Sequence, residues 1–144
     1  MFIPKDPQFK SRIEKKMQAN NFMGYIGFKA TSIEAGKVEG ELILEEHHLQ
    51  QSKFLHGGVT ATVADLVAGF ASFTLVDSHQ TVVTSDLKIS YLNPGIGTKV
   101  FAKGWVIKAG NTLHFAEAEI YCFNDDKETL VAKGYLTFAV VNIP

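Results

Sequence analysis

The spacing of apolar residues indicates a short helix at the start of the chain, followed by strands. In residues 6–20 the apolar side chains recur every four residues, at Phe9, Ile13 and Met17, which predicts an amphipathic helix. Asp6 is placed to cap its start. The period then falls to two, with a break at Gly36, which predicts a hairpin of strands 25–35 and 37–46.

The second half of the chain keeps the period of two over four further segments. These predicted strands lie at 81–92, 98–108, 112–123 and 128–141, and the segments between them are rich in turn residues. The last strand alternates clearly, with the apolar side chains from Leu130 to Val140 on one side. The second half therefore supplies most of the predicted sheet.

A polar loop at 47–55 leads into the longest apolar segment of the chain, residues 54–76, which carries a single charge, Asp65. The segment is long enough to cross a bilayer, but the central Asp65, the nearby His56 and three glycines favour a buried helix and no membrane association. The order of elements predicts an α+β fold, in which an antiparallel sheet wraps around one long central helix within a single domain, 1–144.

The predicted central helix has two unlike faces. Bulky side chains, expected to pack on the sheet, are Val59, Val63, Leu66, Val67 and Phe70. The residues within about 60° of Asp65 are all small, namely Gly58, Ala61, Thr62, Ala68, Gly69 and Ser72. A small face lets a backbone or a ligand approach the helix closely around Asp65. An apolar setting should raise the pKa of Asp65. In the alternative interpretation, Asp65 only bonds a Ser or Thr of a neighbouring element.

His56, Gly57 and Gly58 stand where this helix should begin. The N-terminus of a helix has unpaired N–H groups and a partial positive charge, so this position suits an oxyanion, or is only a loop-to-helix turn. Gly57 and Asp65 are eight residues apart, which is about 12 Å along one helix. If both act on one carbonyl group, they come from two chains, whose helices run antiparallel across a two-fold axis.

Composition excludes several classes of function. The chain is 46% hydrophobic with a net charge of −1, so it lacks the basic excess of a nucleic-acid-binding protein. The single cysteine, Cys122, allows no disulfide within the chain, and the charged N-terminus is unlike a signal peptide. A cytoplasmic location is expected. The histidines at 47, 48 and 56 do not have the spacing of a metal site, so no metal is expected.

The segments LHGGVTATVADLVAGFAS and SDLKISYLNPGIGTKVFAKGWVIKAGNTLHFAEAEIY resemble the hotdog-fold acyl-CoA thioesterases, in the PaaI-like branch that contains an HGG motif. The resemblance implies a homodimer, often paired into a homotetramer, with active sites at the dimer interface. It also implies an acyl-CoA substrate. No cofactor is implied, because coenzyme A is part of the substrate.

The resemblance also implies residue roles. Gly57 matches the residue whose backbone N–H polarises the thioester carbonyl, and Asp65 matches the catalytic carboxylate, either general base or nucleophile. His56 matches the motif histidine that supports the loop. Gln50 falls where relatives place an amide facing the thioester. Relatives commonly have Gly at the position of Lys53, so Gln51 remains an alternative to Gln50.

Further candidates follow from the same resemblance. Thr84 falls where relatives position a water, and strand alternation places it on the face of Val82 and Asp86. Gly58, Thr62 and Gly69 on the small face, with Phe70, Phe73 and Leu87, are expected to line the acyl pocket. Candidates for the coenzyme A phosphates are Lys88, Lys99, Lys103, Lys108, Gly110 and Asn111, although these lysines are equally typical of a solvated surface.

Two other functions remain open for a chain of this kind. A non-catalytic acyl-CoA sensor or scaffold would use the same pocket without turnover. A dehydratase or hydratase acting on acyl thioesters would need a histidine near Asp65, and the central helix carries none there.

Overall fold

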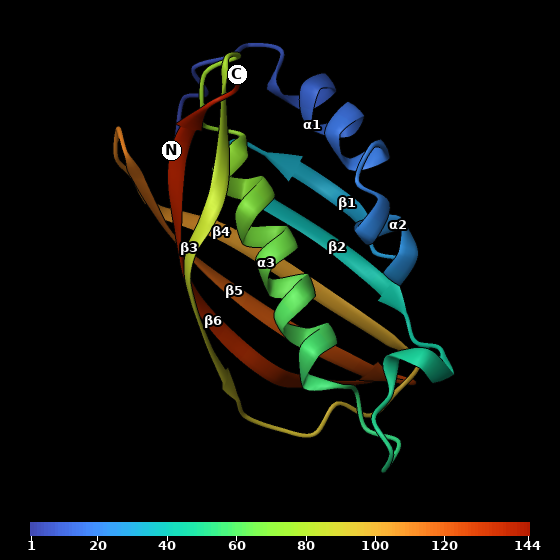
Figure 1. Ribbon diagram of the computed structural model, residues 1–144. Helices are drawn as coiled ribbons and strands as arrows, with labels where there is room; N and C mark the ends of the chain where they lie inside the picture. The colour runs from blue at the N-terminus through green and yellow to red at the C-terminus, as the bar shows by residue number, and fades with distance from the viewer.

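One curved antiparallel sheet wraps around one long helix in the computed structural model, which describes residues 1–144 (Figure 1). The central helix is α3 (Gly57–Phe73). The six strands lie in the order β1-β2-β4-β5-β6-β3, so β1 and β3 are the edges. Their bounds are β1 Lys29–Glu34, β2 Lys37–Ile43, β3 Gln80–Tyr91, β4 Lys99–Ala109, β5 Leu113–Asn124 and β6 Lys127–Asn142. The predicted wrapping of a sheet around one helix is confirmed.

The helix lies unusually close to the middle of the sheet. A Cβ atom added to Gly104 of β4 would stand 2.5 Å from the backbone of Val67 and Ala68. Small residues on both sides allow this approach, so the helix buries Ala64, Ala68 and Ala71 together with Val63 and Val67. Ala68 is fully buried because the small face admits the backbone of β4 there, which is one of the two approaches that the sequence predicts, and Ser72 is also fully buried.

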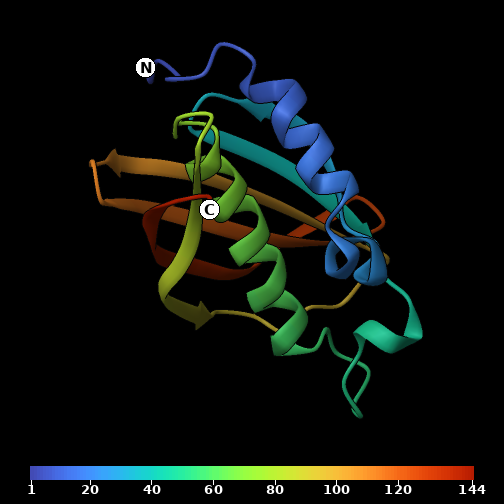
Figure 2. The same cartoon turned by 45° about the horizontal axis from the view of Figure 1, so that its top comes forward.

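Both sides of α3 are flanked by other elements. Figure 2 shows α3 crossing the sheet with β3 on one side and the N-terminal helix α1 (Phe9–Gln18) on the other. β6 turns Ala132, Gly134, Leu136 and Phe138 into the core as predicted. The prediction is wrong for Leu130, which lies on the opposite face, because the pairing with β5 shifts by one residue and buries Val131 instead. Cys122 is also buried in the core, and burial raises the pKa of its thiol to about 11. No helix of the structure has both the length and the apolarity needed to cross a membrane.

The N-terminal region contains one helix more than the pattern predicts. Residues at the start of the predicted strand 25–35 belong instead to a helix, α2 (Asn21–Ile26). The Asn20 side chain accepts a hydrogen bond of 2.9 Å from the Met23 N–H, and Gly27 ends the helix at φ +82°. Met23 and Ile26 are buried at helical spacing. The hairpin itself is confirmed, since β1 pairs with β2 and Gly36 turns the chain at φ +77°.

Two smaller elements also differ from the prediction. α1 begins at Phe9, and Asp6 holds the turn before it by accepting the Gln8 N–H at 2.9 Å. The predicted polar loop contains a 3-10 turn, η1 (Glu46–His48). His48 is buried there because its ring bonds two backbone groups, the Glu45 N–H at 3.0 Å and the Ile26 carbonyl at 2.7 Å.

Candidate active site

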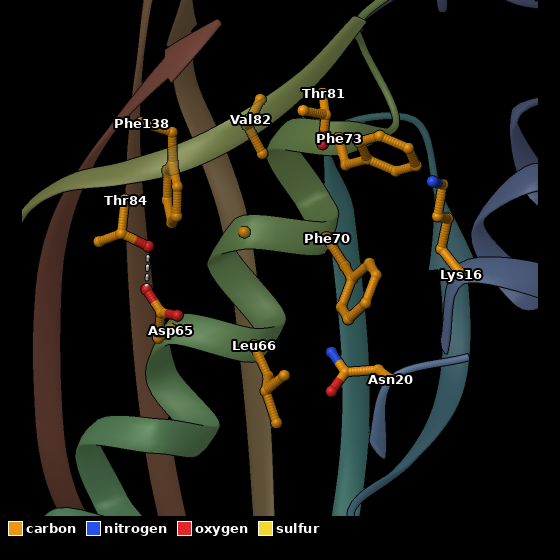
Figure 3. A pocket seen from close by; sticks show the side chains of 11 residues that line it. Lys16, Asn20, Asp65, Leu66, Phe70, Phe73, Thr81, Val82, Thr84 and Phe138 are labelled. Carbon is orange, nitrogen blue, oxygen red and sulfur yellow. Dashed lines mark hydrogen bonds between the residues drawn. The ribbon is translucent and has the colours of Figure 1, made fainter. Parts of the chain in front are cut away.

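Asp65 lies halfway along α3 on the side that faces the edge strand β3, in a pocket of about 280 Å³. Its Oδ1 atom accepts a hydrogen bond of 2.7 Å from the Thr84 hydroxyl (Figure 3). Five of the eleven residues that line the pocket have large apolar side chains, namely Leu66, Phe70, Phe73, Val82 and Phe138. Gly69 also lines it, as predicted, whereas Leu87 does not. The carboxylate therefore stands in a small, partly apolar hollow.

This setting tunes the acidity of Asp65 in two opposite ways. Burial raises the pKa of the carboxyl above its ordinary value, because an apolar environment disfavours the charged form. The Thr84 hydroxyl donates to the carboxylate and lowers the pKa, but by less. The predicted upward shift is confirmed, and it makes the ionised carboxylate a stronger base.

A bulge in β3 presents Thr84 to Asp65. Thr84 pairs with the buried Phe138 of β6, whereas Asp86 pairs with Thr137, so Ser85 is an extra residue. Partners in an antiparallel pair point to the same face, which places Thr84 on the helix side and Asp86 on the outer side. The prediction that Asp86 shares the face of Thr84 is therefore wrong, because the extra residue resets the alternation.

The first turn of α3 leaves one donor unpaired. The His56 ring caps the helix, with Nδ1 accepting the Gly58 N–H at 2.9 Å. The His56 carbonyl accepts the N–H groups of Val59 and Thr60. The N–H of Gly57 has no acceptor within the chain. Gly57 thus offers a free donor at the positive end of the helix dipole. His56 acts as a cap, and its Nδ1 atom carries no proton because it accepts the Gly58 N–H.

Gly57 lines a second cavity, of about 340 Å³, at the start of α3. Gln50 and Tyr91 also line it, together with the turn at 93–95. The Tyr91 hydroxyl donates to the Gly57 carbonyl at 2.7 Å. Asp65 is absent from this cavity, just as Gly57 is absent from the other. One chain therefore does not bring Gly57 and Asp65 into a common cavity, in agreement with their spacing along the helix.

The loop before α3 holds Gln50, rather than Gln51, in the Gly57 cavity. Gln50 bonds the Phe54 carbonyl through its N–H at 2.8 Å, and its side-chain oxygen accepts the Ser52 N–H. Lys53 adopts φ +67°, a conformation that glycine takes most readily. A lysine thus occupies a backbone conformation suited to glycine, and its exposed side chain contacts Glu46.

Other predicted binding residues lie away from both cavities. Lys88 pairs with Tyr135 and Lys108 with Phe115, on the sheet face opposite α3. Gly110 and Asn111 form the β4–β5 turn, near the C-terminal end of α3, where His114 bonds Ser72. Gly58 is exposed at the helix start, and the Thr62 hydroxyl donates to the Gly58 carbonyl at 2.9 Å. Gly58 and Thr62 therefore do not line the Asp65 pocket, and a role of Lys88, Lys108, Gly110 and Asn111 in coenzyme A binding stays a prediction.

The lining residues that sequence reasoning missed include Tyr91, Lys16, Asn20 and Thr81. Tyr91 and Thr81 were hidden within a regular strand pattern, and the two others lie on N-terminal elements whose position no local pattern reveals. No group of three or more His, Cys, Asp or Glu side chains is arranged to hold a metal ion.

Comparisons with known proteins show the family of this chain. The family model described as "Thioesterase superfamily" matches residues 52–129, which is more than half of the chain. The chain belongs to the thioesterase superfamily. Acyl-coenzyme A thioesterase 13 of Homo sapiens is 32% identical over 125 residues, which cover 85% of this chain and 86% of that protein.

Solved structures of thioesterases share the whole architecture. A thioesterase family protein from Silicibacter pomeroyi superposes with a TM-score of 0.92 at 28% identity, covering 94% of this chain and 99% of that one. A thioesterase from Haemophilus influenzae superposes with a TM-score of 0.84 at 21% identity, covering 99% of this chain and 96% of that one, which shows the fold alone. The expected hotdog-fold thioesterase is confirmed, and the protein is a thioester hydrolase.

Proposed function

We propose that this thioester hydrolase cleaves acyl-CoA, at two identical sites that each combine Asp65 of one chain with Gly57 of a second copy. The observation that carries the proposal is the pair of complementary half-sites on α3. One holds a partly buried carboxylate bonded to a hydroxyl, and the other holds an unpaired N–H at a helix N-terminus. The similarity to acyl-coenzyme A thioesterase 13 supports acyl-CoA as the substrate.

The chemistry follows from these two groups. The Gly57 N–H, assisted by the Gln50 amide, polarises the thioester carbonyl and stabilises the negative charge on its oxygen. In one form of the reaction, Asp65 takes a proton from a water held by Thr84, and that water attacks the carbonyl carbon. In the other form, Asp65 attacks directly and water then hydrolyses the mixed anhydride. Both forms release a free acid and the coenzyme A thiol.

The free edge of the sheet indicates how two chains would meet. β3 is a long edge strand that exposes Val83, Leu87 and Tyr91, by 49%, 37% and 56%. An exposed apolar edge strand readily pairs with another strand. Two β3 strands paired antiparallel would join the sheets of both chains and set their α3 helices side by side.

Contacts within the chain define the register of this pairing. Asp65 contacts β3 at Thr84, and Gly57 contacts β3 at Tyr91. An antiparallel pair centred on Lys88, with Ser85 as the extra residue of the bulge, sets Thr84 of one chain opposite Tyr91 of the other. Asp65 of each chain would then face Gly57 of its neighbour. This register supports a shared site and gives two sites per dimer.

The test is thiol release from a panel of acyl-CoA substrates by the wild-type protein and Asp65→Asn, at matched oligomeric state. We expect turnover by the wild type and a loss of about a hundredfold or more in the variant, since general-base groups contribute this much. Equal turnover would remove Asp65 from the mechanism. Binding without turnover by the wild type would indicate a sensor, and native mass measurement distinguishes the monomer, the dimer and a tetramer of paired dimers.

A further inference from the structure

The Asp65 pocket has a polar end that the hydrolysis itself does not use. In Figure 3, Asp65 and Thr84 lie on one side of the pocket, while Lys16 and Asn20 approach from the other side, beyond Phe70. Thr81 also lines the pocket, near Phe73. Lys16, Asn20 and Thr81 are all hydrogen-bond donors, and Asp65 is the only acid among the lining residues.

The docking of α1 places the exposed Lys16 beside the pocket. Arg12, one turn earlier on α1, donates to the Val76 and Asp77 carbonyls at 2.9 and 2.6 Å, just beyond α3. Its guanidinium also stacks over the ring of Phe73, 4.6 Å from the centroid. Ile13 is fully buried against Phe73 and Val76. These contacts dock α1 against the end of α3.

Lys16 and Asn20 both have donors to spare. Lys16 takes part in none of the ion pairs of the chain. The Asn20 side-chain oxygen accepts the Met23 N–H as the cap of α2, which fixes the orientation of the amide. The remaining NH₂ group of Asn20 points toward Phe70 and the pocket in Figure 3.

We infer that Lys16 and Asn20 determine substrate specificity, by binding a carboxylate or another acceptor at the far end of the acyl group. This inference rests on the proposed function. An acyl group bound with its thioester at Asp65 passes the Phe70 and Phe73 rings and meets the ammonium of Lys16 and the amide of Asn20. At about 280 Å³, the pocket is near the lower limit of ligand pockets, about 300 Å³, so it suits a compact acyl group with one polar end.

The test compares two thioesters that differ only at the far end of the acyl group, adipoyl-CoA and hexanoyl-CoA. We expect the wild-type protein to have the higher kcat/KM for adipoyl-CoA. Lys16→Gln should lower the ratio of the two kcat/KM values about fivefold, as expected for the loss of one partly exposed ion pair. Lys15→Gln removes the same charge from an exposed position of the same helix and should leave the ratio unchanged.

Asn20→Asp separates the two roles of Asn20. Aspartate keeps the side-chain oxygen that caps α2, but it replaces the pocket donor with a negative charge. The variant should therefore stay folded and lower the ratio for adipoyl-CoA, while hexanoyl-CoA is still hydrolysed. Circular dichroism checks that α2 and the sheet are retained.

The ratio of the two kcat/KM values also distinguishes a contact with the acyl group from a contact with coenzyme A. A contact between Lys16 and a coenzyme A phosphate would change both rates by the same factor, because both substrates carry the same coenzyme A. An unchanged ratio in Lys16→Gln and Asn20→Asp would therefore overturn the inference while leaving hydrolysis intact. If no thioester of the acyl-CoA panel is cleaved, the proposed function fails. In that case the Kd values for adipoyl-CoA and hexanoyl-CoA, measured by calorimetry for the wild type and the two variants, test the specificity of the pocket.

Discussion

A mixture of two inactive variants should regain activity if each site combines residues from two chains. The first variant is Gly57→Pro, which removes the backbone N–H proposed to polarise the carbonyl. Proline fits here because Gly57 is the first residue of α3, and His56 before it is extended at φ −65° and ψ 131°. The N–H has no acceptor within the chain, so the change breaks no internal hydrogen bond. The second variant is Asp65→Asn.

The size of the recovery follows from the symmetry. Each variant alone should lose about a hundredfold in kcat, the effect of removing an oxyanion donor or a general base. A dimer with one chain of each kind has one site with both wild-type groups and one site with neither. Random reassociation makes about half of the dimers mixed, so about a quarter of all sites are restored in a two-fold dimer.

The assay is thiol release after the two variants are mixed, unfolded in urea and refolded together. Heterodimers purified through two different tags should reach about half of the wild-type rate per dimer, since one of two sites is intact. Gly57→Ala is the control for the added side chain, because alanine keeps the N–H. A Cβ atom at this position, in alanine as in proline, would lie 3.3 Å from the Tyr91 ring.

Two outcomes would refute the reasoning. Purified heterodimers with no more activity than their parents would show that Gly57 and Asp65 of different chains do not form one site. Gly57→Pro homodimers as active as Gly57→Ala would show that the Gly57 N–H is not the donor, whatever the arrangement of the chains.

Two further predictions concern stability. Burial raises the pKa of Asp65 above its ordinary 3.8, so the wild type loses stability as pH rises from that value through the folded pKa. In calorimetric scans at pH 7.5, Asp65→Asn should therefore melt at a higher temperature than the wild type, and the difference should shrink toward pH 4. A lower melting temperature of Asp65→Asn at pH 7.5 would contradict this. Ser72→Ala should lower the free energy of unfolding by about 1–3 kcal/mol in urea titrations, because buried His114 loses its 2.7 Å partner. If Ser72→Ala and the exposed control Ser78→Ala are equally stable, the hydrogen bond between Ser72 and His114 has no such role. Burial also lowers the pKa of His114, so wild-type stability should fall as pH drops below 6.5.

The sequence by itself determined the main elements and the chemistry of α3. Apolar spacing is a local property, so the central helix, the hairpin at Gly36 and the later strands could be predicted without contacts. The sequence also predicted that Asp65 and Gly57 of one chain lie apart. This followed from the single charge, the glycines at the helix start and the rise per residue of a helix. The N-terminal region was harder, because Asn20 and Gly27 delimit a helix too short to show a period.

Only the tertiary structure decided which faces are accessible and which residues complete the pockets. Ala68 is buried because Gly104, far away in the sequence, admits the helix backbone. Asp86 faces outward because pairing with β6 places an extra residue at Ser85. Lys16 reaches the Asp65 pocket because α1 docks against the end of α3. Each outcome depends on contacts between distant segments, and such contacts leave no periodic signal in either segment alone.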